Sequence, residues 1–480
     1  MRRATWGWVA GLAVASLLGW LPFIRRSLSP DEGGFLIVAG QWAPGSSLYG
    51  DHWVDRPPGL IAIFALAEDL GGTTPLRLLG ALAVVAAVVL AALLGRVAAP
   101  GVRSAPIATA AVAAILGATP LFGGSVVNGE VFGIPFVIAG MAALVAAHAS
   151  PSRSGALLWG LTAGATAVMA ALVKQSLLDV FVMALVLLVV RGRRLEPLAA
   201  FLVGAATTTA GALAISARQG TSPGDLWDAL VTFRLDAAEL LADAAGSATA
   251  DRFGGLLLAL LVSVAPVLVI ALGWAARGRP AVEPGPGTPP DLRWPAYAVL
   301  AWELAVVLLG GSYWLHYLMG LVPGIVLLAA AAAQRPRPLG RAVLACYALA
   351  AVSTLSVIVW VALNPIDRAE EPVIDYLAAE AQPGDTAVVA FGGANILREL
   401  DLDCPYTYLW SLPVRVRDPD LAALTELLES PDRPTWLVVS HSTMEPWGLD
   451  FTEPQRQVDA NYSVAAELGR FTVYRLQTDA

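Results

Sequence analysis

The sequence predicts a polytopic α-helical membrane protein that ends in a small α/β domain. Of its 480 residues, 57% are hydrophobic and only 14% are charged, whereas about 25% of the residues of an ordinary soluble protein are charged. Many apolar runs also reach the roughly 20 residues needed to cross a bilayer core of about 30 Å. After Pro365 the composition changes to that of a soluble domain.

Eleven apolar runs are predicted to cross the membrane, at about residues 5–24, 76–95, 105–124, 131–148, 156–173, 177–190, 197–216, 254–274, 294–312, 317–333 and 341–362. The first run follows Met1-Arg2-Arg3. It is predicted to be a retained helix rather than a signal peptide, because no small-residue cleavage site stands out and further spans follow.

The placement of arginines predicts the orientation. With the N-terminus in the cytoplasm, most loop arginines lie on the cytoplasmic side, as the positive-inside rule requires. The outer segments hold fewer cations, among them Arg56, Lys174 and Arg234. The chain is thus predicted to be a multi-pass plasma-membrane protein with a cytoplasmic N-terminus. An odd number of spans places its C-terminal part outside the cytoplasm.

Two outer segments are predicted not to cross the membrane. Residues 25–75 form a long first extracytoplasmic loop, in which "FLIVAGQW" and "GLIAIFALAEDL" are too short to span and are predicted to be interfacial helices. Residues 217–252 form a second outer loop with an amphipathic stretch around "DLWDALVTFRLDAAELL".

The C-terminal part alternates between helical and strand patterns. "EPVIDYLAAEA" and "DLAALTELLES" have helical spacing, whereas "TAVVAFG", "TWLVVS" and "FTVYRL" are typical of strands. Such alternation predicts an extracytoplasmic α/β domain. The predicted domains are therefore a transmembrane domain over 1–363 and this domain over 364–480.

Charge and cysteine usage exclude several classes of function. The net charge of −8 says little about nucleic acid, but the basic residues are scattered over short loops and form no basic domain, which argues against a nucleic-acid partner. Cys346 and Cys404 form no CxxC motif and no disulfide framework.

The stretch "LSPDEGGF" places Asp31 and Glu32 at the outer end of the first span. Pro30 and the pair Gly33-Gly34 favour a turn there. One interpretation is a solvated acidic loop. The functional interpretation is a carboxylate at the membrane surface that takes a proton from an acceptor hydroxyl or holds a metal ion.

The stretch "LYGDHWVDRPPGL" carries Asp55 and Arg56 ahead of Pro57-Pro58. The prolines stiffen the backbone and prevent a helix from starting early. A guanidinium held on such a turn suits a phosphate, which it can bind bidentately. The alternative is a structural Arg–Asp pair within the loop.

Three later stretches also place polar groups at outer span ends. "SVVNGEVFGIP" contains Asn128, an ordinary helix cap in one interpretation, and Glu130. "ALVKQSLLD" contains Lys174, the only lysine of the chain, and Gln175. Lys174 either snorkels to the interface or provides a charge for a lipid phosphate.

The third of these stretches is "GGSYWLHYLMGLVPG", with His316 and Tyr317. It either belongs to an interfacial aromatic belt or contacts a metal, a phosphate or a sugar. By the predicted topology, all of these groups face one outer cavity.

The order of these motifs resembles a known family. The Asp-Glu pair, then "LYGDHWVDRPPGLI", "PLRLLGALAVVAAVVLAALLGR", "NGEVFGIPF", "AALVKQSLL" and "YWLHYLMGLVPGIVLLAA" resemble the family 39-type glycosyltransferases of the GT-C fold. This group includes protein O-mannosyltransferases and bacterial aminoarabinose lipid A transferases. The resemblance covers residues 1 to about 335, and the C-terminal domain resembles the small extracytoplasmic domain of bacterial members.

The resemblance implies an inverting transfer of a monosaccharide from a polyprenyl phosphate to an acceptor hydroxyl outside the cytoplasm. The acceptor is a glycan, a lipid or a protein. The family's catalytic acid matches Asp31, with Glu32 beside it, and its second acid matches Glu130. Arg56 stands where members often carry lysine. The other matches to substrate-binding positions are Asp55, Lys174, Gln175, His316 and Tyr317.

Cofactors and other functions stay open at this point. The sequence establishes no cofactor, but a divalent metal ion held by Asp55 and His316 is one option. The alternative function is a transporter or flippase of a lipid-linked saccharide, for which Glu303 is a candidate charge near the bilayer midplane. A non-catalytic membrane scaffold is a third interpretation, which leaves the clustered outer charges unexplained.

Overall fold

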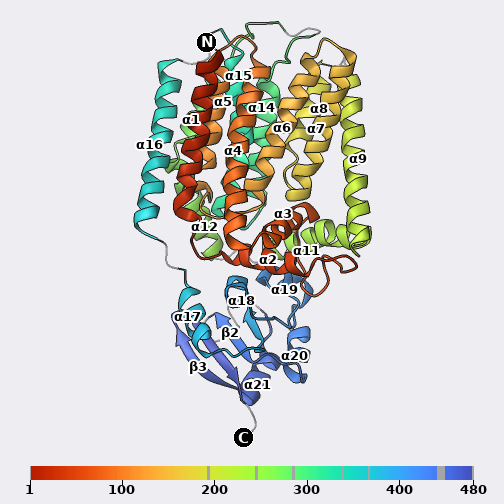
Figure 1. The fold of residues 1–480 in the computed structure, drawn as a ribbon, viewed down its shortest axis with the longest axis vertical. Helices are drawn as coiled ribbons and strands as arrows, with labels where there is room; N and C mark the ends of the chain where they lie inside the picture. The colour runs from red at the N-terminus through yellow and green to blue at the C-terminus, as the bar shows by residue number, and fades with distance from the viewer. Residues whose placement is uncertain are drawn as a thin grey trace. The chain divides into compact units, whose positions relative to one another are not determined.

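The computed structural model describes residues 2–191, 195–243, 247–283, 287–336, 340–365, 368–440 and 449–477. The chain forms two compact units, and Figure 1 labels many of their helices and strands. We call Met1–Arg25, Thr74–Ala214 and Ala244–Pro365 the helical unit. We call Arg26–Thr73, Ile215–Asp243 and Ile366–Ala480 the mixed unit. The predicted division into 1–363 and 364–480 stays a prediction.

The helical unit consists of helices that lie side by side (Figure 1). Its elements are α1 (Arg2–Trp20), η1 (Leu21–Phe23), α4 (Thr73–Ala98), α5 (Ala105–Gly117), η2 (Pro120–Phe122), α6 (Gly129–Ala149), α7 (Arg153–Val173), α8 (Asp179–Arg191), α9 (Glu196–Arg218), α12 (Ser247–Val262), α13 (Ala265–Ala275), α14 (Arg293–Leu309), η4 (Leu315–Leu321), α15 (Val322–Ala333) and α16 (Arg341–Leu363).

Each predicted span overlaps one of these helices or a consecutive pair of them. By length and composition, seven apolar helices in the described part of the chain can cross a membrane. The pair α12 and α13, bent by 55°, makes an eighth if it is one span. The shorter helices α5, α8 and α14 occupy the remaining predicted spans. The predicted class, a multi-pass helical membrane protein, is confirmed, and the number eleven stays a prediction.

Packing in the helical unit follows from residue size and polarity. Every residue of α15 is buried, as expected for a helix that is apolar on all sides. The helices α7 and α9 approach each other so closely that a side chain at Gly164 would collide with the carbonyl oxygen of Phe201. Small residues allow such close contacts between membrane helices.

The mixed unit combines short helices with one sheet. Its helices are α2 (Pro30–Gln41), α3 (Pro58–Asp69), α10 (Pro223–Trp227), the π-helical turn η3 (Asp228–Thr232), α11 (Phe233–Asp243), α17 (Glu371–Glu380), α18 (Ala394–Leu400), α19 (Ser411–Arg417), α20 (Ala422–Glu429) and α21 (Thr452–Asn461). Its strands are β1 (Ala387–Ala390), β2 (Trp436–Ser440), β3 (Tyr462–Leu468) and β4 (Phe471–Leu476).

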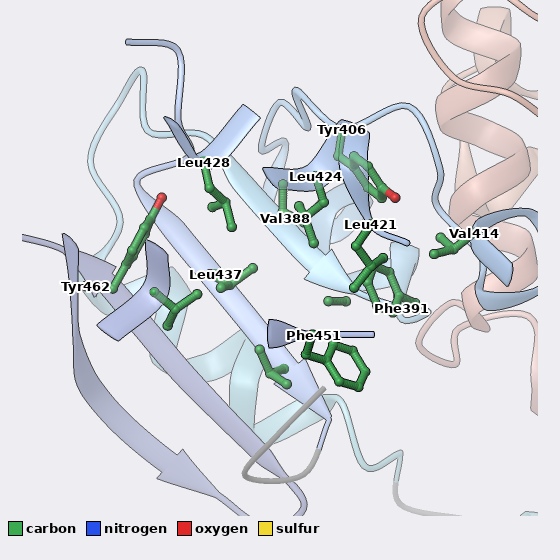
Figure 2. Close-up of a cluster of buried hydrophobic side chains, with 13 residues drawn as sticks. Val388, Phe391, Tyr406, Val414, Leu421, Leu424, Leu428, Leu437, Phe451 and Tyr462 are labelled. Carbon is green, nitrogen blue, oxygen red and sulfur yellow. The ribbon is translucent and has the colours of Figure 1, made fainter. Parts of the chain in front are cut away.

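The four strands have the order β1-β2-β4-β3, with β1 parallel to β2 and the other pairs antiparallel. Figure 2 shows the buried cluster beside the sheet, in which Val388 and Leu437 meet Leu424 and Leu428 of α20. On the other face, Trp436 contacts Tyr376 of α17, with ring centroids 6.4 Å apart. The sheet therefore lies between two layers of helices, and the predicted strands at β1, β2 and β4 are confirmed.

The predicted turn at Asp31-Glu32 is wrong, because Pro30 is the first residue of α2. Ser29 caps this helix and forms a capping box with Glu32, while proline is well tolerated in a first helical turn. Gly33 allows α2 to pack tightly on α18, since a Cβ there would lie 2.5 Å from the Cα of Asn395. The two glycines thus serve close packing rather than a turn.

Candidate functional site

Asp31 lies in the first turn of α2 and is held by a residue from the C-terminal part of the chain. The indole Nε1–H of Trp410 donates a hydrogen bond of 3.0 Å to Oδ1 of Asp31. The indole ring packs on Phe35, with ring centroids 5.3 Å apart, and on Gly34, where a Cβ would overlap it. The sequence analysis missed Trp410, because no local pattern connects it to Asp31.

Glu32 differs from its neighbour in exposure and in partners. Its side chain is fully buried, and its Oε2 accepts a hydrogen bond of 2.8 Å from the backbone N–H of Ser29. The Glu32 backbone N–H in turn donates to Oγ of Ser29 at 3.2 Å. This carboxylate therefore stabilises the start of α2, and its predicted catalytic role stays a prediction.

Asp55, Arg56 and Arg234 form what we call the Asp55 cluster of the mixed unit. The Asp55 carboxylate pairs with Nη1 of Arg56 at 2.5 Å and with Nη2 of Arg234 at 2.6 Å. Burial alone would raise the pKa of Asp55, but Arg234 and Arg56 outweigh this effect and hold the pKa below its ordinary value of 3.8. The structural Arg–Asp pair considered above is present, with a second arginine added.

Hydrogen bonds hold the loop that carries the Asp55 cluster. The Gln41 side chain accepts from the backbone N–H of His52 at 2.7 Å and donates to the His52 carbonyl at 2.8 Å. The hydroxyl of Tyr49 donates to the Arg56 carbonyl at 3.3 Å. Pro57 precedes α3 as its cap residue and Pro58 is its first residue, as the prolines predicted.

Glu130, Lys174, His316 and Tyr317 form what we call the Glu130 cluster of the helical unit. Buried Glu130, in the first turn of α6, forms an ion pair with Lys174. Nζ of Lys174 lies 4.7 Å from the ring centroid of Tyr317, a distance at which a cation is attracted to the ring. His316 packs edge-on against Tyr317 and is close enough to interact electrostatically with Glu130.

Two neighbours complete this description. Asn128 caps α6 by accepting a hydrogen bond of 3.0 Å from Val131 N–H, so the interpretation as a helix cap is confirmed. Gln175 is half-buried and directly follows Lys174. The structure thus brings Glu130, Lys174, His316 and Tyr317 together, although three separate sequence stretches predicted them.

Asp55 and His316, the residues considered as metal ligands, belong to different clusters and have other partners. In the described part of the chain, no group of three or more His, Cys, Asp or Glu side chains could hold a metal ion. The Asp55 carboxylate already pairs with two guanidinium groups, so it does not fit a metal ligand as it stands. The metal role of Asp55 and His316 stays a prediction, and no chemical step below depends on it.

Glu303, the charge considered for the transporter interpretation, is engaged in contacts that connect helices. It is buried in α14, and its Oε1 accepts a hydrogen bond of 2.7 Å from the backbone N–H of Gly324 in α15. The neighbouring Trp302 donates to the carbonyl of Ser176 at 3.1 Å. These contacts connect α14 to adjacent segments of the helical unit.

The comparisons with known proteins identify the fold. No family model and no curated protein matches the sequence. Two crystal structures of ArnT from Cupriavidus metallidurans match 98% of this chain over 98% of their own length. The structure bound to undecaprenyl phosphate has a TM-score of 0.63 at 16% identity, and the apo structure has 0.65 at 14%. The predicted GT-C architecture is therefore confirmed.

Proposed function

We propose that this chain is a membrane glycosyltransferase that moves a sugar from a polyprenyl phosphate to an acceptor hydroxyl, with inversion at the anomeric carbon. The observation that carries this proposal is the fold shared, over almost the whole chain, with an ArnT bound to undecaprenyl phosphate. The order of the polar motifs supports the same function. This fold also favours a transferase over a transporter of lipid-linked saccharides.

The Asp55 cluster suits the phosphate of the donor. Its two guanidinium groups outnumber its one carboxylate, and the side chains of Arg56 and Arg234 are 27% and 38% exposed. A phosphate approaching these side chains would meet a local excess of positive charge. Charge-assisted bonds from guanidinium to phosphate oxygens are strong and directional. They would also stabilise the negative charge that grows on the phosphate as it leaves.

Asp31 is the proposed general base. Its Oδ1 accepts from Trp410, and a carboxylate oxygen pair offers further acceptor sites to an incoming hydroxyl. The acceptor oxygen attacks the anomeric carbon while its proton passes to Asp31, and the bond from that carbon to the phosphate oxygen breaks. The products are the glycosylated acceptor and a polyprenyl phosphate that carries the electron pair of the broken bond.

The Glu130 cluster is assigned to substrate binding. The ion pair neutralises Lys174, and the remaining acceptor sites of Glu130 suit sugar hydroxyls. Rings such as Tyr317 offer an apolar face to the C–H groups of a sugar. A catalytic contribution of Glu130 is part of the same proposal.

The topology belongs to the proposal as well. The N-terminus is assigned to the cytoplasm, and Asp31, Arg56 and the C-terminal domain are assigned to the extracytoplasmic side. Cysteines introduced at the exposed residues Arg153 and Asp432 would test this assignment with a membrane-impermeant thiol reagent on intact cells. With Cys346 and Cys404 replaced by serine, only the cysteine at 432 should react; labelling at 153 alone would reverse the orientation.

The function is tested with purified full-length protein in liposomes that contain a radiolabelled polyprenyl-phosphate sugar, together with a membrane and cell-wall extract as the acceptor. The expected result is transfer of label to the extract and release of an equal amount of polyprenyl phosphate. Label that crosses the bilayer on its intact lipid, without transfer, would instead identify a transporter.

A further inference from the structure

The mixed unit contains a cavity that the reaction described above does not use. Its volume is about 230 Å³, and its lining residues are Ser47, Tyr49, Trp53, Asp225 and Asp228. Cavities for drug-sized ligands measure roughly 300–1,000 Å³. This cavity is therefore the right size for one small ring rather than for a long lipid or a peptide.

One wall of the cavity is an aromatic surface fixed from several segments. The ring of Trp53 lies 4.5 Å from that of Phe233 and 6.3 Å from that of Tyr49, between centroids. The guanidinium of Arg417 lies 5.5 Å from the Trp53 ring centroid. The backbone N–H of Trp53 donates to the carbonyl of Thr407 at 3.0 Å. The wall is therefore formed before any ligand arrives, which reduces the entropy cost of binding.

The polar part of the cavity lining comes from two carboxylates, those of Asp225 and Asp228. Asp225 accepts a hydrogen bond of 3.0 Å from Ser222 N–H in a capping box, and Asp228 pairs with Arg417 at 2.5 Å. Each carboxylate has about four acceptor sites, so these bonds leave sites for a ligand that donates hydrogen bonds. Aromatic rings beside hydrogen-bond acceptors match a sugar, which has C–H groups on one face and hydroxyl groups at its edge.

Charges around the cavity favour a neutral ligand. Burial raises the pKa of the Tyr49 hydroxyl, and the negative charges of Asp55, Asp225 and Asp228 raise it further. Asp55 pairs with both Arg56 and Arg234, and Asp228 pairs with Arg417, so the three carboxylates and the three guanidinium groups are equal in number. A cation or an anion would therefore gain little net attraction here. The protonated Tyr49 hydroxyl adds a group that can donate as well as accept.

We propose that this cavity binds one neutral sugar ring, stacked on Trp53 and Tyr49 and donating hydroxyl hydrogen bonds to Asp225 and Asp228. As the site for the acceptor, it makes the acceptor of the proposed transfer a saccharide rather than a protein side chain. That second step rests on the proposed function, whereas the binding of sugar does not.

The binding is tested by saturation-transfer-difference NMR on the full-length protein in nanodiscs. The probes are methyl α-D-mannopyranoside, methyl β-D-galactopyranoside and methyl α-D-arabinofuranoside, each added alone, with ethanolamine as a cationic competitor. We expect saturation transfer to at least one glycoside. Asp225→Ala should weaken its binding about tenfold, because a hydrogen bond to a charged group is lost.

Two further variants separate this inference from its alternatives. Asp225→Asn keeps an acceptor for the helix cap and should still weaken binding, whereas Asp432→Ala removes an exposed acid elsewhere in the mixed unit and should not. Asp31→Asn should abolish transfer and leave glycoside binding intact, so binding without transfer in the wild type refutes the proposed function alone. Three outcomes would overturn the cavity assignment: no saturation transfer to any glycoside, equal losses in Asp225→Ala and Asp432→Ala, or displacement by ethanolamine.

Discussion

In the mixed unit, Asp55 lies between two guanidinium groups, whereas in the helical unit Glu130 pairs with the single ammonium group of Lys174. Both carboxylates are buried, with 7% and 3% of their surface exposed. The Asp55 cluster therefore has one positive charge more than its carboxylate requires. The Glu130 ion pair is balanced, and the imidazole of His316 also interacts electrostatically with Glu130.

This difference in charge distinguishes two binding roles, which the sequence analysis assigned together to one outer cavity. A surplus of guanidinium charge attracts and holds a phosphate, whereas a neutralised carboxylate offers hydrogen bonds without much net charge. The number of cations in each cluster also determines how much stability is lost when one of them is removed. Removing one of two arginines leaves Asp55 in an ion pair, but removing the only lysine takes away the ammonium group that pairs with buried Glu130.

The largest expected effect concerns Asp31. Comparing its loss with that of Glu130 tests whether the mixed unit or the helical unit supplies the general base. Asp31→Asn should lower kcat by about 10²–10⁴-fold, the usual contribution of a general base, and by more than Glu130→Gln does. Steady-state transfer assays measure both losses. Asp385→Asn is the matched control, because Asp385 also accepts from an indole N–H, that of Trp436, at 2.8 Å. Full turnover by Asp31→Asn would exclude Asp31 as the base.

The second effect is on stability. Lys174→Met should destabilise the protein by about 3–5 kcal/mol, the usual cost of leaving one partner of a buried ion pair alone. Chemical denaturation in mixed micelles measures it, and Glu130→Gln added to Lys174→Met should recover most of the loss. Arg56→Met should cost less, since Arg234 still pairs with Asp55. Equal costs for Lys174→Met and Arg56→Met would contradict the comparison between the clusters.

A smaller effect is expected at Trp410, which positions Asp31. Trp410→Phe keeps an aromatic ring but loses the N–H donor, and should lower kcat about tenfold while the KM for the donor is unchanged, consistent with a hydrogen bond to a charged group. In the Asp31→Asn background the same change should have little further effect, which a double-mutant cycle measures. Trp436→Phe removes an equivalent bond and should leave kcat unchanged; additive losses would assign Trp410 a purely structural role.

The smallest effect is a pH dependence that belongs to the mixed unit. Burial lowers the pKa of His52 below its ordinary value of 6.5, although Asp51 and Asp403 oppose this. The unfolded chain then binds the proton at a higher pH than the folded chain, so the free energy of unfolding falls as the pH drops below about 6.5. Thermal melts should show this decline, and His52→Gln should reduce it; an unchanged slope in that variant would assign the decline to other groups.

Much of the fold follows from apolar periodicity, because span-length runs and alternating strands reflect burial directly. The strand β3 was missed since "YSVAAEL" contains residues of weak strand propensity and a bulge at Val464/Ala466. The start of α2 was predictable from the capping-box spacing of Ser29 and Glu32. Proline and glycine nevertheless pointed to a turn, because the contact of Gly33 with Asn395 is invisible locally.

The site was predictable only in part. Asp31, Asp55, Arg56, Glu130 and Lys174 stand out because charges are rare in an apolar chain and these fall at predicted span ends or in the first outer loop. Arg234 was noted only as an outer cation, and its pairing with Asp55 depends on two loops distant in sequence. Trp410 gave no signal at all, since its role arises from packing between α2 and the C-terminal part of the chain.

The binding of polyprenyl phosphate tests most directly the claim that the surplus charge of the Asp55 cluster holds the donor. Its affinity should be measured by microscale thermophoresis for Arg56→Met, for Arg234→Met and for the double variant Glu130→Gln/Lys174→Met. Arg398→Met, which removes an arginine of similar exposure from an ion pair with Glu68, is the control. We predict that each Asp55-cluster variant loses affinity about tenfold, and that the other two keep it. Unchanged affinity in both arginine variants, with a loss in the Glu130/Lys174 variant, would contradict the account.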